Sequence, residues 1–393
     1  MKQDMKCRIF ISRYPPQPGG SQNYVHEIAS LAHQAGVKVQ VEASWCQGCR
    51  TFDAELPFKV ARSRIWRLIT RLSRTGFRPL VILSILLHFI NSILRSLPGK
   101  YDFMICGSLL STGMGALVRH FVKKTPFILI IYGEEIKWLM NSWKYRWLAK
   151  IIIKQSSRII VISRFTQHYL LSNSSCDSKK VYLFPPGIRN EFMKKFSQEE
   201  ARKRLQINRK PVLLSVGRPE PRKGTLKLIR AFSRFLKDFP GALLFIVGKG
   251  TDLEKCRQLA KELEIKNNIV FTGFVPDEDL QYYFAACDLF ILPNQNLPHD
   301  VEGFGIVFLE ASSQGKPVIG GKSGGVTDAV IDGETGWLIE DVSPENIARA
   351  VTRLLNDPEK MKIMGEKGRK RVLEEYHPEK RKQKLMEIFA KLE

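Results

Sequence analysis

The sequence predicts an α/β protein of two domains, each built around a mainly parallel sheet. Short apolar runs alternate with helical segments along the chain, which is the pattern of strands joined by right-handed crossover helices. The alternation occurs in two rounds, and the boundary between them falls near Pro185-Pro186-Gly187. A length of 393 residues is long for one hydrophobic core and suits two.

The strands of the first round lie before this boundary. We expect them at 7–12, 37–42, 103–106, 127–132, 159–162 and 181–184. The second round predicts strands at 212–216, 242–247, 268–272, 289–292 and 317–320. Helices are expected after most of these strands, among them 21–34, 225–238 and a last helix from about Pro378.

Composition indicates a folded protein with reduced thiols. The chain is 44% hydrophobic and 10% aromatic, which excludes a disordered class. Residues 1–7 are polar and basic and contain no apolar core of signal-peptide length, so secretion is not expected. Seven cysteines is an odd number, and only Cys46 and Cys49 lie close together in sequence. A zinc site would need a second such pair or nearby histidines.

The strongest chemical signal is the run from Glu302 to Glu310, in which a carboxylate precedes a helix and another lies within it. Gly303 and Gly305 have no Cβ, so the backbone at the start of the helix can approach a ligand closely. The first N–H groups of a helix have no intrahelical partners, which suits phosphate. An ionised carboxylate there can accept hydrogen bonds from paired sugar hydroxyls.

Two glycine-containing loops follow strands and carry groups that suit phosphate. Arg218 and Lys223 lie between the strand at 212–216 and the next helix, where open α/β sheets bind their ligands. Two cations suit a diphosphate there, although an isolated Arg and Lys pair is more often a solvated surface feature. Gly19 and Gly20 follow the first strand and offer backbone amides, a weaker signal because most glycine pairs are ordinary turns.

Taken together, these residues resemble glycosyltransferase family 4, whose members are retaining sugar transferases. The resemblance extends over nearly the whole chain, through Val161–Thr166, Pro185–Ile188, Val247–Gly250, Val270–Val275, Gly315–Ile319, Gly324–Val326 and Gly333–Gly336. The stretch from Val301 to Gly325 is most similar to the subgroup that contains mannosyltransferases acting on phosphatidylinositol mannosides.

The resemblance implies the GT-B fold, with two Rossmann-like domains whose mainly parallel sheets face a central cleft. Residues 1–190 would form the acceptor-side domain, with helix 378–393 packing back on it. Residues 191–377 would bind the nucleotide sugar. In the family, the glutamate matching Glu310 binds the ribose and the one matching Glu302 faces the donor sugar. The residues matching Arg218 and Lys223 hold the diphosphate.

The resemblance also implies the remaining site residues. The loop matching Gly19-Gly20 closes over the diphosphate, and backbone at Phe274-Val275 lies near the base. We expect catalytic roles for Arg218, Lys223 and Glu302. The expected donor site comprises Gly19, Gly20, Gly217, Arg218, Lys223, Phe274, Val275, Glu302, Gly303, Phe304, Gly305, Ile306, Val307 and Glu310. Contacts to the donor sugar or the acceptor are expected from Tyr132, Glu134 and Arg164.

Two positions depart from the family pattern. Many members have a histidine where this chain has Tyr132, and tyrosine can hydrogen-bond a sugar hydroxyl but cannot take over a histidine role. Members often have an aspartate where this chain has Arg189, so an interdomain contact of that aspartate cannot be carried over to this chain.

No metal or other cofactor is expected. Asp277-Glu278-Asp279 matches the Asp-x-Asp pattern of metal sites in a different glycosyltransferase fold. Here Asp277 opens a helix, so an N-cap with acids in the first turn explains the run better. His299 and Asp300 precede Glu302, and we expect them to shape the loop rather than to bind zinc.

The positive charge is concentrated in the first half. Residues 1–190 contain 28 basic and 9 acidic residues, a net charge of +19, whereas residues 191–393 contain 34 and 30, a net charge of +4. No acid interrupts 58–99, and five arginines recur there at helical spacing: Arg64, Arg67, Arg71, Arg74 and Arg78. An apolar stripe accompanies them, formed by Ala61, Ile65, Leu68, Ile69 and Leu72. The apolar run that starts at Leu80 is shorter than the ~18–20 residues that span a bilayer.

A basic amphipathic segment of this kind indicates an anionic membrane surface, and we expect docking through 59–94. A second basic and aromatic stretch includes Trp138, Trp143, Lys144, Arg146, Trp147 and Lys150. The alternative is that the apolar stripe packs on the first domain and the arginines face water. Nucleic acid is not an expected partner, because no DNA- or RNA-binding motif accompanies the charge.

The sequence therefore predicts a cytoplasmic enzyme on the inner face of the cell membrane. We expect it to transfer a hexose of mannose or glucose type from a GDP- or UDP-linked donor, with retention. The acceptor would be a hydroxyl of a membrane-associated glycolipid or polyprenyl-linked glycan. The alternatives are an epimerase or a phosphorylase on the same scaffold, and a binding protein that kept the nucleotide site without catalysis.

Overall fold

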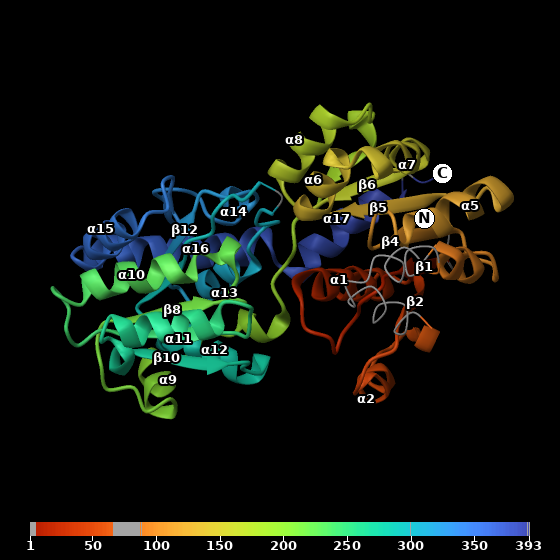
Figure 1. Cartoon of the computed structure of the whole chain (residues 1–393). Coiled ribbons are helices and arrows are strands. Elements are labelled where there is room, and N and C mark those ends of the chain that lie inside the picture. The colour runs from red at the N-terminus through yellow and green to blue at the C-terminus, as the bar shows by residue number, and fades with distance from the viewer. Residues whose placement is uncertain (1–4, 66–86, 88, 299, 391, 393) are drawn as a thin grey trace. The chain divides into compact units, whose positions relative to one another are not determined.

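The computed structural model describes residues 5–65, 87, 89–298, 300–390 and 392. The chain divides into two compact units (Figure 1). The first comprises residues 1–187 and 379–393, and the second comprises residues 188–378. The chain thus passes from one unit to the other after Gly187 and again after Pro378.

The first unit is built on a parallel sheet of seven described strands, in the order β3-β2-β1-β4-β5-β6-β7. Every residue of the central strands β4 and β5 is buried, as expected for apolar runs covered by helices on both faces. The strands are β1 (Lys6–Phe10), β2 (Lys38–Ser44), β3 (Lys59–Ser63), β4 (Phe103–Cys106), β5 (Phe127–Ile131), β6 (Arg158–Val161) and β7 (Val181–Leu183).

Helices connect these strands and cover both faces of the sheet. They are α1 (Gly20–Gln34), α2 (Cys49–Ala54), residues 89–96, α5 (Gly113–Lys123), α6 (Gly133–Asn141), α7 (Trp143–Gln155), α8 (Arg164–Asn173) and the C-terminal α17 (Pro378–Ala390). Helix α17 packs on the first unit. The ring of Phe389 lies 4.9 Å from that of Phe103 on β4, and Arg381 pairs with Glu27 on α1.

The second unit is built on a parallel sheet in the order β10-β9-β8-β11-β12-β13. Its strands are β8 (Val212–Val216), β9 (Leu243–Val247), β10 (Ile269–Gly273), β11 (Leu289–Leu292), β12 (Val318–Gly321) and β13 (Gly336–Ile339). Its helices are α9 (Gln198–Arg204), α10 (Thr225–Phe235), α11 (Leu253–Glu262), α12 (Asp277–Ala286), α13 (Ile306–Ser313), α14 (Val326–Ala329), α15 (Pro344–Leu355) and α16 (Pro358–Glu375).

The strand order places a topological switch point in the second sheet. From β8 the chain proceeds outward through β9 to β10, and then returns to form β11 on the other side of β8. The loops that leave the carboxyl ends of β8 and β11 therefore lie side by side. In open α/β sheets this is where ligands bind.

The predicted fold class is confirmed, and two strands were missed. Strand β3 occupies Lys59–Ser63, so the expectation that the amphipathic helix includes Ala61 is wrong. The five arginines at helical spacing begin at Arg64, after this strand ends. The rest of the predicted docking segment falls largely on residues 66–86 and 88, outside the described residues. Strand β13 was missed because it directly follows the glycine turn Gly333–Gly336. None of the described helices is long and apolar enough to cross a bilayer.

Candidate active site

The loops after β8 and β11 meet at a position that only glycine allows. The short 3₁₀ turn Pro221–Lys223 ends at Gly224, whose φ is +66°. A Cβ on Gly224 would lie 2.2 Å from the carbonyl oxygen of Pro293, which follows β11. A side chain there would push the two loops apart. This close approach places Lys223 beside the loop that carries Glu302.

The carboxylate of Glu302 is the centre of the site. Its Oε2 accepts hydrogen bonds from Lys223 Nζ at 2.5 Å, Asn294 Nδ2 at 2.6 Å and Arg222 Nη1 at 2.8 Å. Burial raises the pKa of Glu302, but Lys223 and Arg222 outweigh this effect and hold the pKa below its usual range. Glu302 is therefore ionised, and it can only accept hydrogen bonds.

Two members of this cluster, Arg222 and Asn294, were not predicted from the sequence. Arg222 is buried and also pairs with Asp300 at 2.9 Å, so its guanidinium is shared by the carboxylates of Glu302 and Asp300. Asn294 is fully buried and follows β11, one strand from the loop of Lys223. Its place at the carboxyl end of a strand beside the switch point was the available signal.

Arg218 lies apart from this cluster. Its side chain is 67% exposed and pairs with Glu220 at 3.0 Å. The structure thus brings together Lys223 and Glu302 of the predicted catalytic residues, but not Arg218. Its assignment to the diphosphate stays a prediction.

The start of helix α13 has the features expected for binding an anion. The helix begins at Ile306, after Gly305 with φ +87°, and no side chain caps it. Ile306 and Val307 are half-buried, so their backbone N–H groups lie near the surface at the positive end of the helix dipole. The ring of Phe304 is buried near Tyr376, so this residue can offer a ligand only its backbone.

Two glycines before α14 also contact the backbone of the loop that precedes α13. Gly324 has a φ of +51°, and a Cβ on it would lie 2.1 Å from the carbonyl oxygen of Glu302. The N–H of Gly325 donates to the same oxygen at 2.8 Å. The Gly324-Gly325 pair, noted in the sequence as a motif, therefore supports the backbone of the Glu302 loop.

Glu310 has a partner that the sequence did not predict. Arg189 Nη2 lies 3.1 Å from Glu310 Oε1, and its Nη1 pairs with Asp277 at the start of α12. The guanidinium also lies over the ring of Phe192, 4.7 Å from its centroid. Burial raises the pKa of Glu310, and the charge of Arg189 offsets this only in part.

The acids that open α12 are held by arginines. Asp277 is the first residue of the helix rather than its N-cap, so the predicted N-cap is wrong, whereas the predicted acids in the first turn are confirmed. Asp279 pairs with Arg204 at 3.1 Å. Among the described residues no group of three or more His, Cys, Asp or Glu is arranged to hold a metal ion.

The other predicted donor residues lie at the carboxyl edge of the same sheet. Gly217 follows β8 with φ +154°, and its N–H donates to the carbonyl of Val247 on β9. Phe274 follows β10 and is 61% exposed, next to the half-buried Val275. Their contacts with a nucleotide stay predictions.

The predicted residues of the first unit follow strands β1, β5 and β6, again at the carboxyl edge. Gly20 opens α1, and a Cβ on it would meet no atom within 4 Å. The hydroxyl of Tyr132 is buried and has no hydrogen-bond partner among the described residues, and burial raises its pKa. Arg164 is exposed at the start of α8. The side chain of Glu134 lies outside the described part.

Comparison with known families identifies both halves of the chain. Residues 18–192 match the model described as Glycosyltransferase Family 4, and residues 197–371 match the model of Glycosyl transferases group 1. The chain belongs to glycosyltransferase family 4.

Named relatives of this family 4 glycosyltransferase match over its whole length. It is 29% identical over 386 residues to the GDP-mannose-dependent alpha-(1-6)-phosphatidylinositol monomannoside mannosyltransferase of Mycolicibacterium smegmatis, covering 96% of each chain. The monoacylated-substrate mannosyltransferase of Corynebacterium glutamicum is 26% identical, with 99% of each chain covered. Among solved structures, sucrose-phosphate synthase of Thermosynechococcus elongatus shares the fold with a TM-score of 0.79 at 22% identity, with 99% of each chain covered.

The Arg189–Glu310 pair predicts a pH dependence of nucleotide binding. If ribose hydroxyls bind to ionised Glu310, affinity falls as the pH drops through the pKa of Glu310. Arg189→Ala removes the charge that lowers this pKa, so the loss should begin at a higher pH than in the wild type. Below the pKa the affinity should fall about tenfold per pH unit, which calorimetry with GDP and UDP between pH 8 and 5 would measure.

Two variants serve as controls for this experiment. Arg189→Lys keeps a cation and should retain a profile near that of the wild type. Asp277→Asn removes an acid that raises the pKa of Glu310, so it should shift the loss to lower pH. Parallel profiles for the wild type and Arg189→Ala would show that Arg189 does not control the ionisation of Glu310.

Proposed function

We propose that this protein is a retaining hexosyltransferase that uses a nucleotide-diphosphate sugar and a membrane-associated glycolipid or polyprenyl-linked glycan. The observation that carries the proposal is the Lys223–Glu302 pair at the switch point, next to the uncapped start of α13. The full-length relatives named as GDP-mannose-dependent mannosyltransferases of phosphatidylinositol mannosides support mannose as the sugar and GDP as the carrier. Glucose and UDP are the second choice.

The residues of the second unit have distinct roles in this proposal. The ammonium of Lys223 and the first N–H groups of α13 stabilise the negative charge that develops on the leaving diphosphate. Glu302, held ionised by Arg222 and Lys223, accepts hydrogen bonds from hydroxyls of the transferred sugar. Glu310 accepts the ribose hydroxyls. Arg218, which is exposed, would reach the diphosphate only after leaving Glu220.

Retention follows when the acceptor hydroxyl attacks the face of the sugar from which the diphosphate leaves. The departing phosphate oxygen then takes the proton of the acceptor. This route needs no protein nucleophile, and no metal ion is required because Lys223 and the helix amides carry the charge stabilisation. Asp277 and Asp279 are each paired with an arginine, which supports a structural role for these acids.

The acceptor places the reaction at a membrane. We propose that the enzyme works on the cytoplasmic face of the cell membrane as a peripheral protein. The high positive charge of the first half of the chain supports an anionic membrane as its partner.

A transfer assay tests the proposed reaction. The purified protein is incubated with GDP-mannose, UDP-glucose or UDP-galactose carrying a radiolabelled sugar, together with bacterial membrane lipids. The radiolabel should move into the lipid phase, with GDP-mannose in particular. NMR should show that the new linkage keeps the α configuration. Excess EDTA should not stop the reaction. Recovery of an epimerised nucleotide sugar would contradict transfer, and binding without turnover of any donor would indicate a binding protein.

Lys223 provides the first test of the catalytic residues. Lys223→Ala should cost ~2–4 kcal/mol of transition-state stabilisation, about 30- to 1,000-fold in kcat/KM, the range for losing one preorganised donor. Glu302 keeps Arg222 and Asn294 as partners in this variant, so the fold should survive. Lys237→Ala, an exposed lysine of the same unit, is the matched control. Wild-type turnover of folded Lys223→Ala would refute its role.

The two glutamates should separate by what they bind. Glu310→Ala should weaken binding of GDP or UDP itself, because the ribose is present in donor and product alike. Glu302→Gln keeps an oxygen acceptor for Arg222, Lys223 and Asn294, so it should leave this binding nearly intact and reduce transfer of the sugar. Titration calorimetry with the free nucleotides decides between these outcomes, and equal losses in both variants would mean that the roles are assigned wrongly.

A further inference from the structure

Exposed apolar side chains gather on three helices of the first unit. They are 38% to 64% exposed, although each lies in a helix whose other side is packed. We call them the apolar surface, and its members are Ile90, Leu94, Phe121, Val122, Trp147 and Ile151. Large apolar residues exposed on helices that pack together are candidates for a binding surface.

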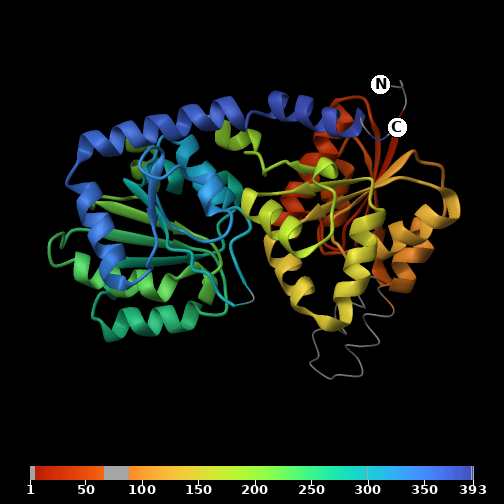
Figure 2. The ribbon, with the colours of Figure 1, turned by 90° about the horizontal axis from the view of Figure 1, so that it is seen from above.

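Helix α5 packs against both of the other helices. The hydroxyl of Ser96 donates to the carbonyl of Gly115 on α5 at 2.8 Å, and a Cβ on Gly113 of α5 would lie 3.0 Å from Ile152 on α7. Figure 2 shows helices in orange to yellow on the face of the sheet opposite α17. Right-handed crossovers place these connections, from β3 through β6, on one face.

Helix α7 shows that packing within the unit does not account for the exposed residues. Its inner side is filled by Leu148, Ala149, Ile152 and Ile153, all buried. Trp147 and Ile151 are one turn apart on another side of the helix, at 61% and 38% exposure. When a helix is apolar on a second side as well as on the side that faces its own core, the second side is expected to contact another molecule.

The charge around the apolar surface is positive. Residues 103–133 and 136–176 contain no acid. Lys123 and Lys124 follow Val122 and are exposed, and Arg146, Lys150 and Lys154 are exposed on α7. A second copy of this face would oppose lysine with lysine, whereas anionic headgroups complement the lysines and the apolar side chains can enter the acyl boundary.

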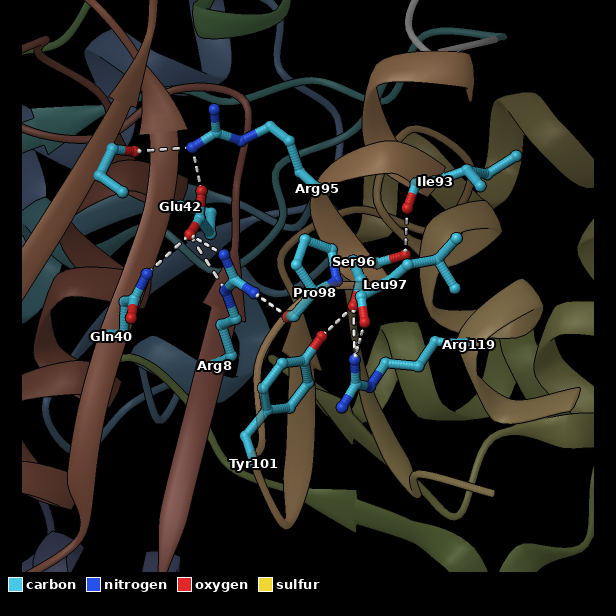
Figure 3. Close-up of polar contacts among 11 residues, drawn as sticks. Arg8, Gln40, Glu42, Ile93, Arg95, Ser96, Leu97, Pro98, Tyr101 and Arg119 are labelled. Carbon is cyan, nitrogen blue, oxygen red and sulfur yellow. Dashed lines mark hydrogen bonds and ion pairs between the residues drawn. The ribbon is translucent and has the colours of Figure 1, made fainter. Parts of the chain in front are cut away.

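A buried charge cluster fixes the helix that carries Leu94. Arg95 and Arg8 both pair with the fully buried carboxylate of Glu42, and Gln40 donates to it at 2.9 Å (Figure 3). Arg119 of α5 donates to the carbonyls of Ser96 and Leu97 at 2.9 and 2.6 Å, which satisfies the end of the helix. With Arg95 directed to the sheet, its neighbour Leu94 is held outward at 64% exposure.

We propose that the apolar surface on residues 89–96, α5 and α7 docks the protein on an anionic lipid bilayer by insertion of its apolar side chains between headgroups. This inference adds a docking surface to the membrane acceptor proposed above. Its test measures binding without turnover, so that failure of docking and failure of the transferase proposal remain distinguishable.

Vesicle sedimentation of the full chain tests this proposal. Vesicles of phosphatidylcholine with 30% phosphatidylglycerol are compared with phosphatidylcholine alone, at low and high salt. The wild type should bind the anionic vesicles at least tenfold more tightly. The double variant Trp147→Ala with Ile151→Ala should bind the anionic vesicles at least tenfold more weakly at both salt concentrations, because the contacts it removes are apolar and are not screened by salt. Lys150→Glu with Lys154→Glu should lose affinity mainly at low salt.

Two controls keep the outcome interpretable. Ile363→Ala with Leu373→Ala removes exposed apolar residues of α16 in the other unit and should bind like the wild type. Donor hydrolysis and thermal unfolding should be unchanged in all variants, since the replaced side chains are exposed. Unchanged vesicle binding of Trp147→Ala with Ile151→Ala would overturn the proposal. A second result would also overturn it. This is a wild type that does not bind vesicles and forms a dimer in ultracentrifugation, and a variant that is monomeric.

Discussion

The buried carboxylate of Glu302 holds the donor-side loops together. One of its oxygens receives three donors, from the loop after β8 and from the segment after β11. A buried carboxylate left without any cationic partner is strongly destabilising, so these loops are constrained to stay in register. The glycines at 224 and 324 permit this approach, because any side chain there would meet a backbone carbonyl. The start of α13 and the side chain of Lys223 take their positions from this cluster.

Both carboxylates expected at the donor are paired with cations of the chain itself, Glu302 with Lys223 and Glu310 with Arg189. A diphosphate at Lys223 competes with Glu302 for the same ammonium, so donor binding exchanges one ionic partner for another. Arg189 is a departure from the family pattern, and its ion pair gives it a role within the donor unit. Its charge lowers the pKa that burial of Glu310 raises, and this favours the ionised form that a ribose-binding acceptor requires.

The sequence was sufficient for features that depend on local pattern. Apolar runs located most strands, and the family resemblance assigned Lys223 and Glu302 to one donor site, where the structure brings them together. The sequence could not show which of the three nearby cations is buried. Arg222 is buried beside Glu302, whereas Arg218, which was expected to act there, is exposed. The pairing of Arg189 with Glu310 spans 121 residues and arises only from tertiary packing. Strand β3 was missed because Ala61, at its centre, was assigned to the apolar stripe of an amphipathic helix.

A crystal structure with bound GDP would test most directly whether the switch point of the second unit binds the nucleotide through Lys223, the start of α13 and Glu310. The β-phosphate should lie within hydrogen-bond distance of Lys223 Nζ and of the N–H groups that open α13, and both ribose hydroxyls should lie on Glu310. A nucleotide bound elsewhere, with the Lys223–Glu302 and Arg189–Glu310 pairs unchanged, would contradict this binding mode.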